Sequence, residues 1–126
     1  WAKHHPIFEG MPAGGILDHT YYRQVVPGGA SNTPHALWSG LDVPAEVVAG
    51  SINASLGYSS GLLVAVYDFG AGRLTLNTLR ILENLGTDPV AERLLRNMLR
   101  HAAQNASEPL ADLPADFEQR LKAMGY

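Results

Sequence analysis

The stretch that decides the fold is VYDFGAGRLTLNTL, residues 66–79. It continues an almost uninterrupted apolar run, GLLVAVYDFG (residues 61–70), which has the length of a strand covered on both faces. The turn Gly70-Ala71-Gly72 follows, and its two glycines permit a backbone with positive φ. The residues after the turn alternate between apolar and polar. The sequence therefore predicts an antiparallel hairpin.

Upstream of the hairpin, two further strands are expected. ILDHTYYRQVV (residues 16–26) is rich in β-branched and aromatic residues and is followed by Pro27 and two glycines. EVVAGSINASLGY (residues 46–58) predicts a weaker strand that is interrupted by Gly50. Residues 1–15 are turn-rich and predict an irregular lead-in, and residues 30–45 predict a long loop.

The clearest helix is DPVAERLLRNMLRHAAQ, residues 88–104, with Asp88 as the N-cap and Pro89 at the first helical position. Apolar residues recur at the helical spacing and form one stripe: Val90, Ala91, Leu94, Leu95, Met98, Leu99 and Ala102. The other side carries arginines and is interpreted as a solvated basic face: Arg93, Arg96 and Arg100. Glu92 is placed four residues before Arg96 for an ion pair.

Residues 106–126 predict a terminal helical tail whose helix starts near Pro114. Phe117, Leu121 and Met124 are expected to form its buried side. Strands followed by helices indicate an α/β sheet layered by helices. Because the strong helices all lie at the C-terminal end, one face of the sheet is expected to lack cover from within this chain.

Composition limits the function classes. A chain of 126 residues with 46% hydrophobic and 17% charged content is expected to be globular, as one domain or part of one. Its net charge of −3 gives no electrostatic footprint for nucleic acid. The chain has no cysteine, which excludes disulfides and thiolate chemistry. No apolar run approaches the roughly 18 residues that span a bilayer, so a membrane is not expected as a partner. The mild net charge likewise gives no reason to expect nucleic acid.

Three stretches resemble one family. HHPIFEGMPAG (residues 4–14) with LDHTYY (residues 17–22) resembles the His-Pro-Ile…Gly-Leu-Pro and acidic-x-x-Tyr elements of trehalose-utilisation-protein-like domains. These domains have the flavodoxin-like fold of class I glutamine amidotransferases. Residues 66–79 resemble their closing hairpin, in which a Gly-x-Gly-Arg turn leads into the last strand. RILENLGTDPVAERLLRNMLRHAA (residues 80–103) resembles the final helix of such a domain at the end of large bacterial β-galactosidase-type glycoside hydrolases.

The resemblance covers most of the chain to about Gln104. It implies that residues 1–126 are a single domain, the C-terminal half of a flavodoxin-like domain, with a partial flavodoxin-like α/β sheet, a C-terminal antiparallel hairpin and C-terminal helices. The abrupt start at Trp1 fits a fragment, or a small subunit completed by a partner. The earlier half of such a domain, which would hold a nucleophile, has no counterpart here.

The implied function is a non-catalytic accessory and assembly segment of a carbohydrate-active enzyme, with no catalytic residues, cofactor or metal of its own. The implied partners are the remainder of the parent enzyme, a partner subunit or a second copy, with a carbohydrate as ligand. A periplasmic or extracellular location follows from the resemblance alone.

Polar residues near the hairpin's end form a candidate binding site, because ligands lie outside the carboxyl ends of strands in doubly wound sheets. The candidate ligand-binding residues are Asn77, Thr78, Arg80, Asp18 and Trp38. A structural interpretation is preferred: Asn77 and Thr78 satisfy backbone groups, Arg80 pairs with Glu83, and Trp38 anchors a loop. None of these residues is a nucleophile with a neighbouring base, so the set suits binding better than catalysis.

The histidines and acids suggest little catalytic chemistry. A metal set is conceivable from His4, His5 and His19. Neighbouring residues in an extended chain point to opposite sides, so His4 and His5 are poor joint ligands, and a structural role for His5 beside Pro6 is preferred. His101 is expected at the surface. The acids are too scattered for two-carboxylate glycoside hydrolysis. Two alternatives stay open: an independent small-molecule hydrolase or sugar-binding domain, and a structural homo-oligomerisation module.

Overall fold

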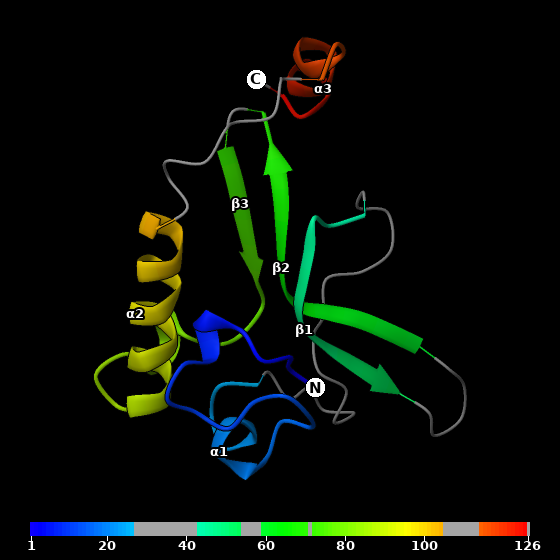
Figure 1. Cartoon of the computed structure of the whole chain (residues 1–126). Helices are drawn as coiled ribbons and strands as arrows, with labels where there is room; N and C mark the ends of the chain where they lie inside the picture. The colour runs from blue at the N-terminus through cyan, green and yellow to red at the C-terminus, as the bar shows by residue number, and fades with distance from the viewer. Residues whose placement is uncertain (27–42, 54–58, 71, 105–113, 126) are drawn as a thin grey trace.

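The computed structural model describes residues 1–26, 43–53, 59–70, 72–104 and 114–125. They form a mixed α/β chain in which a three-stranded sheet is accompanied by helices (Figure 1). The strands are β1 (Glu46–Asn53), β2 (Ser59–Phe69) and β3 (Gly72–Asn77). The helices are the short 3₁₀-helices η1 (Pro6–Phe8) and η2 (Leu82–Asn84) and the α-helices α1 (His19–Tyr22), α2 (Pro89–Gln104) and α3 (Phe117–Ala123).

The sheet has the order β1-β2-β3, and both strand pairs are antiparallel. Phe69 pairs with Gly72 at the turn and Val64 pairs with Asn77 at the open end of the hairpin, so the predicted hairpin is confirmed. Gly70 has φ of 55°, in the left-handed region where glycine is favoured. The weaker strand at residues 46–58 is confirmed over Glu46–Asn53.

Gly50 in β1 makes room for the first residue of the chain. A Cβ atom there would lie 2.9 Å from the Gly61 carbonyl oxygen and 2.9 Å from the Trp1 ring. The Gly50 N–H donates to the Trp1 carbonyl at 3.0 Å, and the Lys3 N–H donates to the Val48 carbonyl at 3.1 Å. The predicted irregular lead-in therefore also covers the outer edge of β1, and the glycine marks a close backbone approach.

The centre of β2 is sheltered on both faces. Leu63, Val64, Ala65 and Val66 are at most 4% exposed. The expectation of an uncovered sheet face is therefore wrong for this run. The core that shelters it takes side chains from the lead-in and the α1 segment as well as from α2: Ile7, Phe8, Tyr21, Val25 and Leu94. The sequence had assigned no covering role to the first two of these segments.

The strand predicted at residues 16–26 is wrong, because the segment forms the short helix α1 (His19–Tyr22). Asp18 is its N-cap and accepts a hydrogen bond from the Thr20 N–H at 2.9 Å. Tyr21 and Val25 point into the core and are fully buried. The aromatic and β-branched residues thus serve burial rather than strand pairing.

Helix α2 is confirmed where it was predicted. The Asp88 Oδ1 caps it by accepting from the Val90 N–H at 2.9 Å. Ala91 and Leu94 are fully buried, but Leu99 is 63% exposed, so the apolar stripe is covered only over the first turns. The expected ion pair between Glu92 and Arg96 is not among the contacts of the described residues.

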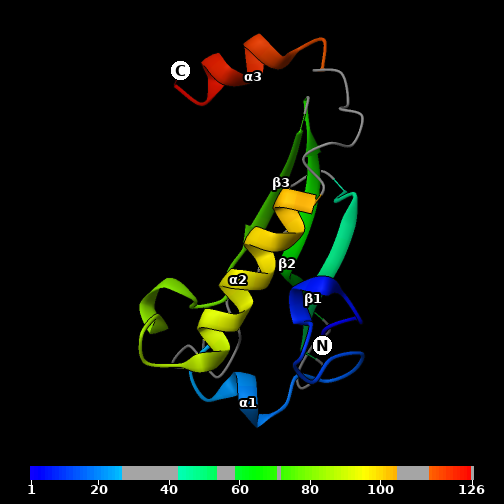
Figure 2. The same cartoon turned by 60° about the vertical axis from the view of Figure 1, so that its left-hand side comes forward.

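The terminal helix α3 forms, but its expected buried side does not. No residue of α3 is buried, and Met124, just after it, is 61% exposed. Figures 1 and 2 show α3 standing beyond the tip of the hairpin, away from α2. The predicted loop at residues 30–45 lies largely outside the described residues, which omit 27–42.

Candidate functional site

The polar residues at the end of β3 bond to nearby backbone groups. The Asn77 amide holds the Leu79 backbone on both sides: its Oδ1 accepts from the Leu79 N–H at 2.9 Å, and its Nδ2 donates to the Leu79 carbonyl at 3.3 Å. The Thr78 N–H and hydroxyl both donate to the Leu63 carbonyl, at 2.9 and 3.3 Å. These bonds support the structural interpretation of both residues, and a binding role stays a prediction.

Arg80 and Asp18 also have local partners. The Arg80 Nε donates to the Glu83 Oε2 at 2.6 Å, as the structural interpretation expected. The Arg80 backbone N–H donates to the Val25 carbonyl at 2.8 Å, which ties the connection after β3 to the α1 segment. Asp18 caps α1 through Thr20. Trp38 lies outside the described residues, so the complete candidate set is not visible together.

A different polar cluster joins the lead-in, β1 and α2. His5, Glu46 and His101 each offer one ligand atom, and these atoms lie within 4.8 Å of one another. The His5 Nε2 is 3.4 Å from the Glu46 Oε2, and the His5 and His101 rings meet edge to face with centroids 4.6 Å apart. Lys3 bonds the other oxygen of Glu46. The sequence analysis missed this cluster because its members are separated by about forty residues or more.

The hydrogen bonding of His5 fits a metal site poorly. The His5 Nδ1 accepts from the Ile7 N–H at 3.2 Å and so caps η1, which confirms a structural role for this residue. A neutral imidazole has one lone-pair nitrogen, so Nε2 then carries the proton and can donate to Glu46. A metal ion at Nε2 would need that lone pair and would also face the Lys3 ammonium. His4 and His19, the other predicted ligands, are not part of this cluster.

This cluster predicts acid sensitivity. Burial lowers the pKa of His5 below its ordinary 6.5; Glu46 opposes that shift, whereas His101 and Lys3 add to it. The unfolded state then binds the proton more readily, so the contribution of neutral His5 is present above pH 6.5 and is lost as the pH falls through the folded-state pKa. The Lys3 hydrogen bond lowers the pKa of Glu46, whose contribution is lost at still lower pH.

We expect His5→Asn to flatten the dependence of unfolding free energy on pH between about 7.5 and 5.5, because asparagine keeps a cap acceptor but does not titrate. Urea unfolding at several pH values measures this slope. His19→Asn is the matched control, since His19 is exposed on α1. An unchanged slope in His5→Asn would contradict the prediction.

Comparisons with protein-family models, with curated proteins and with solved structures found no match to this chain. The resemblance drawn from the three sequence stretches therefore stays a prediction. None of the helices within the described residues is long and apolar enough to cross a membrane.

Proposed function

We propose that this chain is a non-catalytic accessory and assembly segment of a carbohydrate-active enzyme, and that it packs against the rest of that enzyme through its sheet. The observation that carries the proposal is the outer edge of β3. Within the described residues, β3 pairs only with β2 and none of its residues is buried. Such an unpaired edge is a template for a further strand.

The hairpin's position strengthens this proposal. Figures 1 and 2 show the tip of the β2–β3 hairpin extending beyond the C-terminal end of α2. Leu74 on β3 is 45% exposed and Ile52 on β1 is 68% exposed. Since residues 1–3 cover part of the outer edge of β1, the edge of β3 is the better acceptor for a strand. We propose that an extended segment of the parent enzyme binds the edge of β3 as an additional strand, by β-augmentation.

The flavodoxin-like fold is part of the same proposal. The described strands are all antiparallel, so the parallel strands of a flavodoxin-like sheet would have to join at an edge. The link to glycoside hydrolases rests on the resemblance of residues 4–22, 66–79 and 80–103. A partner subunit or a second copy is the alternative occupant, and a periplasmic or extracellular location belongs to the proposal on the same ground.

The oligomeric state of the purified chain tests the role of the edge. In isolation, the edge of β3 is expected to accept a second copy, so light scattering and native mass spectrometry should show concentration-dependent dimers. Leu74→Lys should reduce the dimer fraction, because lysine on an edge strand opposes pairing. Leu82→Lys is the matched control, since Leu82 on η2 is 78% exposed. A persistent monomer, or equal effects of both variants, would count against the proposal.

Titration with galactose, measured by calorimetry, distinguishes this proposal from the alternative of a sugar-binding domain. We expect no saturable binding and only background hydrolysis of chromogenic glycosides. Saturable binding that is lost in Asn77→Ala and Arg80→Ala, with the fold retained by circular dichroism, would instead support the sugar-binding alternative. Turnover of a glycoside would overturn the non-catalytic assignment.

A further inference from the structure

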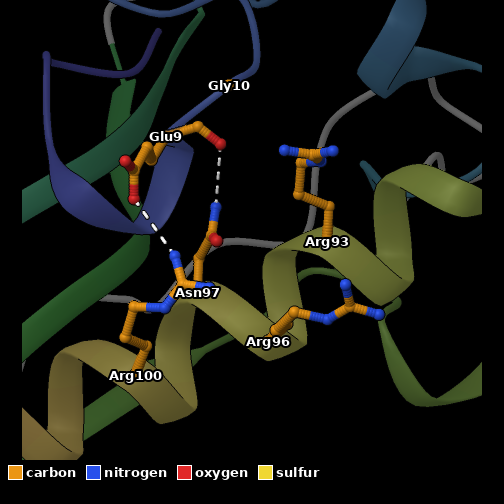
Figure 3. A pocket seen from close by; sticks show the side chains of 6 residues that line it. All are labelled: Glu9, Gly10, Arg93, Arg96, Asn97 and Arg100. Atoms are coloured by element: carbon orange, nitrogen blue, oxygen red, sulfur yellow. Dashed lines mark hydrogen bonds and ion pairs between the residues drawn. The ribbon is translucent and has the colours of Figure 1, made fainter.

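A pocket of about 240 Å³ lies between α2 and the turn that follows η1 (Figure 3). It is lined by Glu9, Gly10, Arg93, Arg96, Asn97 and Arg100. The buried Asn97 joins the two sides of the pocket, because its Nδ2 donates to the carbonyls of Ile7 and Glu9, both at 3.0 Å. These bonds hold the turn over the helix and keep the pocket's two sides together.

The charge of the pocket is predominantly positive. Three guanidinium groups line it, against one carboxylate, that of Glu9. The Glu9 Oε2 lies 3.3 Å from the Arg100 Nη1. Because both side chains are more than half exposed, their ion pair contributes less than ~1 kcal/mol to stability. Arg93 and Arg96 have no carboxylate partner within the described residues. Like charges three and four residues apart on one helix repel, and a bound anion relieves that repulsion.

The Glu9–Gly10 turn leaves space for the Arg93 guanidinium. Gly10 has φ of 73°, and a Cβ atom there would lie 2.6 Å from the Arg93 Nη1. Figure 3 shows Arg93 and Arg100 on either side of Asn97, with Arg100 reaching toward the Glu9 carboxylate. The arginines therefore border a concave surface that α2 forms with the turn. A basic helix face that only contacts solvent would not need such a surface.

We propose that this pocket binds a small oxyanion, a phosphate or carboxylate group, through Arg93 and Arg96, with Arg100 joining when its ion pair with Glu9 opens. Guanidinium groups present parallel N–H donors that match both kinds of oxyanion. The volume lies below the ~300–1,000 Å³ of pockets that enclose drug-sized ligands, so it suits a single anionic group. The proposal is independent of the assembly role of β3.

Titrations of the full chain test the site, with inorganic phosphate in one arm and acetate in the other. NMR spectra at pH 7 and constant ionic strength should show saturable shifts at residues 9–10 and 93–100. Arg93→Gln and Arg96→Gln should each weaken binding by about tenfold, or about 1.4 kcal/mol, through loss of charged hydrogen bonds. Glutamine preserves helix propensity, so the fold is expected to remain.

Two further variants make the result specific. Glu9→Gln removes the competing carboxylate and should strengthen binding severalfold, which a purely structural role of the turn would not produce. Arg23→Gln is the matched control, because it removes one positive charge outside the pocket. Tighter binding of phosphate or of acetate identifies the preferred class. Non-saturable shifts in both arms, or equal weakening by Arg23→Gln, would overturn the proposal in favour of diffuse charge screening.

Discussion

Replacing Tyr21 by alanine is expected to remove much of the stability of this protein. Tyr21 heads the largest fully buried side chains, packs edge to face on Phe8 with centroids 5.8 Å apart, and donates its hydroxyl to the Pro12 carbonyl. Truncating a buried aromatic side chain costs about 3–5 kcal/mol, out of a total that is about 5–15 kcal/mol for a typical domain. Urea unfolding followed by circular dichroism measures the loss.

Two variants separate the contributions of Tyr21. Burial, reinforced by Asp18, raises the pKa of Tyr21 to about 12, so the hydroxyl remains a donor at neutral pH. Tyr21→Phe removes only that donor and is expected to cost about 1–3 kcal/mol, because the Pro12 carbonyl loses its partner. Tyr22→Ala is the neighbouring control, since Tyr22 is 53% exposed. If Tyr21→Ala and Tyr22→Ala lowered stability equally, the proposed core role would be wrong.

The elements that the sequence predicts well carry their signals locally. The hairpin follows from an apolar run and a glycine turn within residues 61–79, and the structure places Gly70 at positive φ. Helix α2 follows from its cap, its proline and its apolar spacing, all within residues 88–104. No contact with a distant segment was needed to find either element.

The α1 segment shows where composition misleads. Its tyrosines and valines have high strand propensity, yet that propensity mainly reports how well a side chain packs. Asp18 followed by Thr20 was an available cap signal for a helix start, and the cap bond now accounts for the turn. Helix α3 is the opposite case, because Phe117 and Leu121 have helical spacing but remain incompletely buried in the described structure.

The polar sites could be predicted only where the interacting groups lie close together in the sequence. Asn77 bonds the Leu79 backbone and Arg80 pairs with Glu83, which are close in the sequence, and the structural interpretation identified such roles. Thr78 instead bonds the Leu63 carbonyl, fifteen residues away on β2. The cluster of His5, Glu46 and His101 depends on three elements meeting in space. No spacing rule reports such a meeting.

Asn97 offers the second large effect, because one amide joins segments that are far apart in the sequence. Asn97 is 5% exposed, and its Nδ2 donates to the carbonyls of both Ile7 and Glu9. Asn97→Ala removes both hydrogen bonds and leaves the buried Ile7 carbonyl and the partly buried Glu9 carbonyl without this donor, at a cost of about 2–4 kcal/mol. Thermal and urea unfolding measure this loss, with the exposed Glu92→Ala on the same helix expected to stay within about 0.5 kcal/mol.

The position of the loss distinguishes a tether from an ordinary helix contact. If Asn97 holds the lead-in to α2, amide hydrogen exchange in Asn97→Ala should rise at residues 7–11, and the midpoint of α2 should be less affected. Asn97→Asp should be at least as destabilising at pH 7, since a carboxylate cannot donate to the two carbonyls and would be buried beside them. Lowering the pH to protonate that aspartate should recover part of the stability relative to the parent chain. Equal stability of Asn97→Ala and Glu92→Ala would show that this amide does not fasten the turn.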